Sequence, residues 1–492
     1  MINLRIFKRA APVVQLAAGA ALLTACVSSS SQVTATALQH APALVSPDAA
    51  AAQRDDVHGS WPSAQWWTQY HDDTLNALIT QALSKAPGMA SAEARFATAR
   101  EMVRLADDDG LNLAASADAS RQRLSDNGLF SPKFLGFNWY NQADLGLRGT
   151  YSFDFWHKRR DTVAAALDDA HVAQAQRDAV ALSLSTSIAQ SYFGWQADQV
   201  QIGILQQQQV LAEKRRAIIK ARVDAKLDPV DGVYAADTEI AALHQAIVNG
   251  QYSAKLRRVT LAALLGINVD ALPDFTPRPL PAVDLQLPDN VAIDLLARRA
   301  DIDASRWMVE AAQRRMSVAH AEFFPDISLN ALAGLSSIEF GKLFEAGSAV
   351  PSIGAAIHLP VFDSGYLRAQ YGVRATQVNA AISAYNETIV NAAREVATST
   401  VQLQQIAAQR TAQQVQYDAA THLLEVAQAR YQQGLTDARP QLQAEQSVQQ
   451  QQLALANLQS AALAAQINLI LSLGGGYQST NTDAALAASK ME

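Results

Sequence analysis

The one residue whose setting points to a covalent modification is Cys26, the only cysteine in the chain. It follows Leu23, Thr24 and Ala25, at the end of a short apolar stretch that basic residues precede. A signal peptidase cleaves such a segment, and a cysteine directly after the cut is an acceptor for lipid. The pattern predicts a signal peptide over residues 1–25 and lipidation of Cys26.

The lipid would hold the mature protein at a membrane, because each buried CH₂ group contributes about 0.8 kcal/mol and several acyl chains act together. Val27 follows the cysteine, where an acidic residue would favour retention at the inner membrane, so we predict the outer membrane. Residues 26–60 are rich in Ser, Ala and Pro, which is typical of a flexible tether. The alternative is an ordinary buried cysteine beside a signal peptide.

The sequence contains no motif that indicates an enzyme. The nine histidines lack metal-ligand spacing, and the motifs of serine hydrolases, zinc proteases and phosphate-binding loops do not occur. Gly474, Gly475 and Gly476 follow a predicted helix and are typical of a helix stop. We therefore expect no enzyme activity and no cofactor beyond the lipid on Cys26.

The charge balance argues against a nucleic-acid partner. The net charge is −7, and the predicted signal peptide carries three basic residues and no acid, so the mature chain reaches about −10. A chain this acidic repels the phosphate backbone of DNA or RNA.

Four segments alternate apolar and polar residues with a period of two: about 111–123, 141–156, 326–337 and 351–362. Each is long enough for a tilted strand that crosses a membrane, which takes about 9–11 residues. No run of 18 or more apolar residues occurs after residue 30, so we expect no membrane-spanning helix. The alternative is a half-buried sheet of a soluble protein, which shows the same alternation.

Long helices follow each pair of predicted strands. Residues 158–222 and 367–431 contain no proline. In the second segment apolar residues recur every seven positions, as at Ile382, Ile389 and Val396. This spacing is typical of helices packed side by side. The predicted elements are a hairpin over about 157–265, a helix over about 291–324 and a hairpin over about 364–472.

These elements occur twice in the same order, about 208 residues apart. Ala221–Arg222–Val223 returns as Ala429–Arg430–Tyr431, and a predicted turn follows each copy. A repeat of this length exceeds a solenoid unit and indicates a duplicated half. The predicted organisation is repeat 1 over residues 61–270, a proline-rich linker over 271–290, repeat 2 over 291–473, and an equatorial or flexible C-terminal tail over 474–492.

Four strands are too few to close a barrel, and open sheet edges are not tolerated in lipid. We therefore expect the chain to assemble, and three copies would supply twelve strands. The predicted fold class is an α+β membrane protein. Its homotrimer forms a 12-stranded outer-membrane β-barrel, with four strands per chain, continuous with a long α-helical periplasmic barrel. Such an assembly is a duct.

Five stretches carry a resemblance to a known family: WWTQY at 66–70, LARRADI at 296–302, FFPDISL at 323–329, LPVFDSG at 359–365 and RYQQGLT at 430–436. The chain resembles the NodT group of outer-membrane efflux lipoproteins in the TolC superfamily, and within it the multidrug and fusaric-acid-type exporters. The resemblance extends from about Trp61 to Tyr477. It implies a homotrimer that serves as the exit duct of a tripartite pump, with a HlyD-like periplasmic adaptor and an inner-membrane transporter.

The family narrows its tunnel beside the helix–turn–helix tips, often with an acidic or a leucine ring. Here the acidic position falls on Gln443, and a leucine position of some relatives falls on Arg439. The 208-residue offset makes Asp231 the counterpart of Arg439. We hypothesise that Asp231 and Arg439 of neighbouring hairpins pair around the closed aperture. The alternative is that both are solvated surface charges.

The same tips are the family's contact with the adaptor. The matching residues are Lys226, Leu227 and Asp228 at the first tip and Gly434, Leu435 and Thr436 at the second. Because lysine replaces glycine at the first tip, it stays open whether both tips engage the adaptor equally.

The predicted function is the outer-membrane channel of an efflux pump that exports drugs or toxic small organic compounds. One alternative is the outer-membrane component of a type I secretion system for proteins or peptides. The other is a periplasmic coiled-coil scaffolding lipoprotein, which would not need four alternating strands. The cargo and the energy source belong to the inner-membrane pump, and this sequence does not reveal them.

Overall fold

The computed structural model of the chain describes residues 34, 36–38, 61–107, 110–127, 132–283, 298–362 and 365–479. The predicted signal peptide, Cys26, most of the tether and the tail after residue 479 lie outside these residues. The chain divides into two compact units. We call residues 98–171 and 307–383, with the described residues before 38, the sheet unit, and the other described residues the helical unit.

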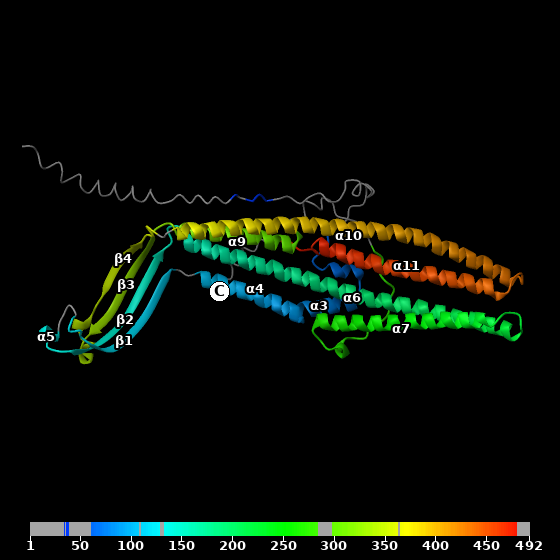
Figure 1. The fold of residues 1–492 in the computed structure, drawn as a ribbon, viewed down its shortest axis with the longest axis horizontal. Coiled ribbons are helices and arrows are strands. Elements are labelled where there is room, and N and C mark those ends of the chain that lie inside the picture. The colour runs from blue at the N-terminus through cyan, green and yellow to red at the C-terminus, as the bar shows by residue number, and fades with distance from the viewer. Residues whose placement is uncertain are drawn as a thin grey trace, which may run out of the picture. The chain divides into compact units, whose positions relative to one another are not determined.

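The sheet unit contains four antiparallel strands that pair in the order of the sequence (Figure 1). They are β1 (Leu111–Arg123), β2 (Trp139–Phe153), β3 (Asp326–Ser337) and β4 (Ser352–His358). The predicted segments 111–123 and 326–337 coincide with β1 and β3. The prediction 141–156 began two residues late and ended three residues late. Its end was wrong because the Asp154 carboxylate already accepts the first N–H groups of the next helix. The prediction 351–362 was also too long, since Pro360 has no N–H to continue the ladder.

The pairing register separates an apolar face of the sheet from a polar face. Leu145 lies opposite Ala117 on one side and Leu335 on the other, and the odd-numbered residues of all four strands share this face. Even-numbered residues share the opposite face, where Asp118 lies opposite Asp144. The alternation that predicted strands therefore persists across the whole sheet, and this pattern is typical of a barrel wall between lipid and water.

Aromatic contacts join helix to strand within the sheet unit. α9 (Ala300–Ala321) ends shortly before β3, and Phe324 in the connection stacks on Trp156 with ring centroids 4.6 Å apart. The Trp156 indole N–H donates to the Pro325 carbonyl at 2.8 Å. These contacts join the connection before β3 to the turn after β2.

Part of the predicted tether contacts the sheet unit. The Thr36 backbone N–H donates to Asn379 Oδ1 at 3.0 Å, and Asn379 Nδ2 donates to the Thr34 carbonyl at 2.7 Å. The Asn379 side chain thus both accepts a hydrogen bond from this backbone and donates one to it. The predicted flexible tether is therefore held to the sheet unit at this one short site.

Two helical hairpins continue from the sheet unit into the helical unit (Figure 1). Their helices are α6 (Lys158–Asp224), α7 (Asp231–Leu265), α10 (Tyr366–Gln432) and α11 (Ala438–Ser472). α6 and α10 have 67 residues each, and α7 and α11 have 35 each. Ile389 and Val396 of α10 are 1% and 2% exposed, which confirms that the seven-residue spacing marks a packed face.

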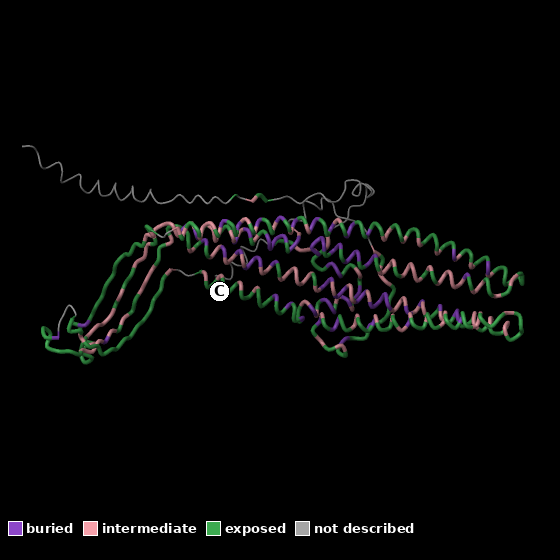
Figure 2. The backbone as a smooth tube through the Cα atoms, in the orientation of Figure 1, coloured by how far each residue is buried: buried purple, intermediate pink, exposed green. Residues whose placement is uncertain are grey.

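The largest hydrophobic core lies in the helical unit, where α3 (Asp73–Lys85) packs against α7 and α6 (Figure 2). Leu75, Ile188 and Leu261 are fully buried there. The Asp72 side chain caps α3 by accepting the Leu75 N–H at 3.0 Å and also accepts the Tyr192 O–H at 2.8 Å. Burial, together with this bond to a carboxylate, raises the pKa of Tyr192 to about 12.

Shorter elements complete the described chain. They are η1 (Trp66–Tyr70), α4 (Pro87–Ala106), α5 (Pro132–Leu135), η2 (Val269–Ala271), η3 (Phe340–Lys342) and η4 (Ala346–Ser348).

The sequence predicted no membrane-spanning helix, but one helix is long and apolar enough to cross a membrane. Among the described residues, α11 alone reaches the length and hydropathy required. Its apolar residues have another partner, because Leu463, Ile467 and Ile470 are buried in the core of the helical unit. The hydropathy of α11 therefore reflects packing against the other helices, as in the core helix of many proteins.

Candidate functional site

The two hairpin tips share one backbone conformation. At the end of α6 the Lys226 N–H donates to the Val223 carbonyl and the Leu227 N–H to the Arg222 carbonyl, at 2.9 and 2.8 Å. At the end of α10, Gly434 makes the equivalent bond at 2.9 Å. This is the Schellman motif, which needs a residue with positive φ. Lys226 has φ 62° where Gly434 has φ 71°.

Replacing Lys226 with glycine should stabilise the first tip by about 1 kcal/mol, because a residue with a Cβ atom is strained at positive φ. Hydrogen exchange of the amides at the end of α6 would measure the change. The control is Lys226→Ala, which removes the same charge and keeps the strain. Equal protection in the two variants would contradict the backbone explanation.

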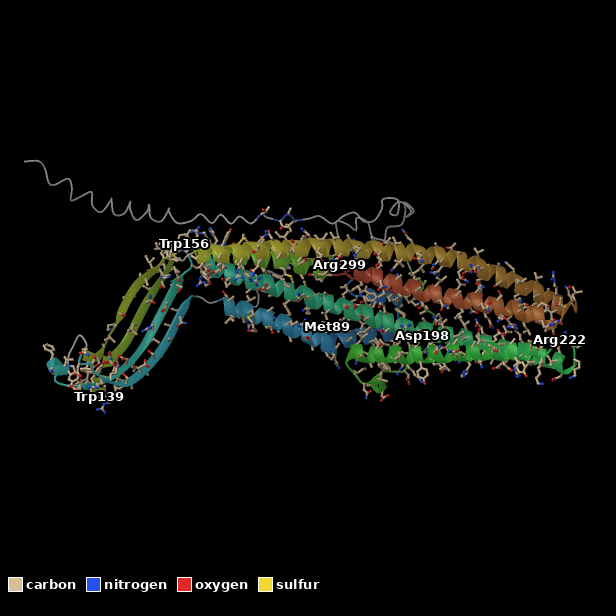
Figure 3. The ribbon with its side chains drawn as sticks, in the orientation of Figure 1. Met89, Trp139, Trp156, Asp198, Arg222 and Arg299 are labelled. Atoms are coloured by element: carbon tan, nitrogen blue, oxygen red, sulfur yellow. The ribbon has the colours of Figure 1, made fainter. Side chains whose placement is uncertain are left out.

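Each tip also holds an ion pair of its own. Arg222, which Figure 3 labels at the end of α6, donates to both Asp228 oxygens at 2.6 and 3.0 Å. Arg439 donates to Asp437 at 2.9 Å. Asp437 also caps α11 by accepting the Arg439 N–H at 3.0 Å.

The tip charges influence one another across the two hairpins. The hydrogen bond from Arg222 lowers the pKa of Asp228, and Arg439 of the other tip lowers it further. In the same way the hydrogen bonds from Arg439, and the charge of Arg222, lower the pKa of Asp437. Both carboxylates are therefore charged at neutral pH, and their pairing is lost only as the pH falls through these lowered pKa values. We call these four residues the tip charge cluster.

The predicted aperture residues lie on the first turns of the return helices. Asp231 begins α7 and accepts the Gly232 N–H at 3.1 Å. Arg439 is the second residue of α11, and Gln443 is exposed one turn further on. In the single chain Arg439 is bonded to Asp437 instead of Asp231. A pair between Asp231 and Arg439 of neighbouring hairpins in an assembly stays a prediction.

A polar link that the sequence analysis missed joins the two hairpins. Arg215 of α6 donates to Glu239 of α7 at 3.1 Å and to Gln446 of α11 at 2.6 Å. Gln446 donates to Glu239 at 2.5 Å. Counting from Asp231 and from Ala438, Glu239 and Gln446 are each the ninth residue of their helix. We call these three residues the hairpin link.

A neighbouring ion pair makes no such connection. Arg216 donates to Asp237, and the two residues belong to α6 and α7 of one hairpin. By the 208-residue offset the counterparts of Glu239 and Gln446 are Ser447 and Thr238, so the repeat did not reveal this pairing. Only the fold shows that the Glu239 and Gln446 side chains meet. Within the described part of the chain, no three His, Cys, Asp or Glu side chains gather as a metal site.

Known proteins share this arrangement. The sequence model of the outer membrane efflux protein family matches residues 78–267 and 292–475. The multidrug resistance outer membrane protein MdtP of Escherichia coli K12 is 34% identical over 436 residues, which cover 86% of this chain and 89% of MdtP. The outer membrane protein VceC of Vibrio cholerae is 32% identical with a TM-score of 0.76, over 85% of this chain and 100% of VceC. The Campylobacter jejuni CmeC outer membrane channel has the same fold, with a TM-score of 0.79 at 20% identity, over 93% of this chain and 97% of CmeC.

Proposed function

Because the chain belongs to the outer membrane efflux protein family, we propose that it is the outer-membrane exit duct of a tripartite efflux pump. It is a passive conduit that receives drugs or toxic small organic compounds from an inner-membrane transporter or the periplasm and releases them outside the cell. The name of MdtP, a multidrug resistance protein, supports small compounds over secreted polypeptides as cargo.

The observation that carries the proposal is the sheet with one apolar face and two open edges. Within the described sheet, β1 and β4 each have a neighbour on one side only. In lipid an unpaired backbone group costs several kcal/mol, so these edges must pair between copies. A homotrimer that pairs β1 of one copy with β4 of the next has twelve strands, an even number within the range of outer-membrane barrels. The equal lengths of the paired helices support a duplicated half as the origin of this chain.

Lipid on Cys26 anchors the duct in the same membrane as its barrel. We place the contact with a HlyD-like periplasmic adaptor at the tips, around Leu227 and Leu435, which are 65% and 69% exposed. Exposed leucines at the end of a hairpin suit helix-to-helix docking. Aperture closure is assigned to Asp231, Arg439 and Gln443 together with the tip charge cluster.

The test is the single-channel conductance of the purified mature protein in a planar bilayer, with Arg439→Asp alongside it. The wild type should give a small, steady conductance. The variant should open more, because three copies lose an attraction and gain repulsion from Asp437 and Asp228. An exposed pair contributes about 0–1 kcal/mol, so each copy changes the open fraction by up to about fivefold.

The matched control is Arg430→Asp, an equal charge change at an exposed position of the same tip. Equal conductance of the wild type and Arg439→Asp would reject the gate and keep the duct. Absence of any channel from folded wild-type protein would reject the duct itself.

A further inference from the structure

Two arginines lie on the apolar face of the sheet. Arg121 and Arg123 end β1, and the register puts them opposite Asn141 and Trp139. In the described strands they are the only charged residues on that face. The other charged residues of the strands lie on the opposite face: Asp118, Asp144, Arg148 and Asp326. The sheet thus separates these two cations from all of its other charges.

The position of the two arginines along β1 corresponds to the boundary between the apolar layer of a bilayer and water. The apolar residues of β1 on this face extend from Leu111 to Ala119. Nine residues at about 3.4 Å each, tilted by about 40°, cover roughly 23 Å. The apolar band of outer-membrane barrels is about 25 Å tall, and an arginine is nearly neutral only near its boundary. Arg121 and Arg123 follow directly after this band.

Trp139 marks the same boundary. Figure 3 shows it at the end of the sheet away from Trp156, and its side chain is 54% exposed. Tryptophan is enriched where a membrane meets water. The Arg121 guanidinium lies over the Trp139 ring, 5.6 Å from its centroid. A cation held over a ring in this way keeps N–H groups that can still donate to an anion.

Arg123 is also available to an anion. Its side chain is 58% exposed, and the Asp126 carboxylate with which it pairs is 3.7 Å away and 69% exposed. Such a pair in water is weak. The guanidinium fork fits two oxygens of a phosphate, so two such groups two residues apart on one strand form a phosphate-binding edge.

We propose that Arg121 and Arg123, positioned by Trp139, bind the phosphate groups of lipid in the outer leaflet of the membrane. The proposal rests on the proposed function, because that function places the helices in the periplasm and this end of the sheet at the cell surface. The site would fix the height of the barrel in the bilayer and favour lipid that carries phosphate on its headgroup.

The experiment measures binding of a phosphorylated glycolipid of the outer leaflet to the purified full-length protein in detergent, through the shift in Tm. The same lipid with its phosphates removed, and inorganic phosphate alone, are the comparison probes. The variants are R121Q/R123Q, the charge-keeping R121K/R123K, and R148Q as a matched control on the opposite face. D126N removes the competing carboxylate.

A cation near anionic lipid contributes about fivefold to binding, so R121Q/R123Q should weaken binding by about twenty-five-fold. R148Q should bind as the wild type does, R121K/R123K should keep most of the affinity, and D126N should bind more tightly. Equal stabilisation by the dephosphorylated lipid, or by inorganic phosphate, would overturn the proposal.

Conductance of the same preparations separates this proposal from the function. Normal channels with unchanged lipid binding in R121Q/R123Q would reject the lipid site and leave the duct in place. A wild-type protein without channels would reject the duct.

Discussion

Replacing Leu261 with alanine should lower the free energy of unfolding by about 3 kcal/mol. Leu261 lies on α7 in the core that α3, α6 and α11 complete, and its side chain has no exposed surface. Truncation removes buried apolar surface and leaves a cavity, because the neighbouring Leu75 and Ile188 are held on different helices. Thermal unfolding followed by circular dichroism would show a Tm lower by several degrees.

The control for this prediction is Leu256→Ala on the same helix. Leu256 is 66% exposed, so the same truncation should change the Tm little in the single chain. If Leu256→Ala destabilised the purified assembly as much as Leu261→Ala, this face of α7 would be buried by another copy. Equal and small effects of both variants would contradict the position of the core.

Replacing Glu239 with alanine should open the closed duct by about tenfold. Glu239 accepts from both Arg215 and Gln446, so its removal breaks the hairpin link and leaves the half-buried Arg215 without its carboxylate. Hydrogen bonds to a charged group contribute about 1.5–3 kcal/mol, and 1.4 kcal/mol changes an equilibrium tenfold. The open fraction in single-channel recordings would measure this directly.

Asp237→Ala is the matched control, because it breaks the Arg216 pair within one hairpin and leaves the hairpin link intact. We expect this variant to conduct as the wild type does. A similar opening in both variants would mean that negative charge near the tips, and not the link between hairpins, holds the duct closed. No opening in either would reject the link as a closing contact.

The sequence predicted helices and strands well where the periodic pattern lies within one continuous segment. The alternation in residues 111–123 and 326–337 marked β1 and β3, and a long proline-free heptad pattern marked α10. The predicted end of β4 was wrong. The apolar alternation continues through Val361, but the pairing with β3 ends at His358, before Pro360.

The candidate site was predicted less completely, because it depends on which hairpin faces which. The counterpart positions Asp231 and Arg439 followed from the repeat, but the structure bonds Arg439 to Asp437 within its own tip. The hairpin link needs three helices to converge. A heptad pattern shows which side of a helix is packed, but not which neighbour packs there.

The open edges of the sheet also have a genetic consequence in the proposed trimer. Each copy supplies one edge to each neighbour, so one defective β1 or β4 leaves the whole wall unclosed. In a cell that makes normal and edge-defective chains in equal amounts, only about one trimer in eight would contain normal chains alone. In the proposed trimer an edge mutation would therefore be dominant over the normal copy.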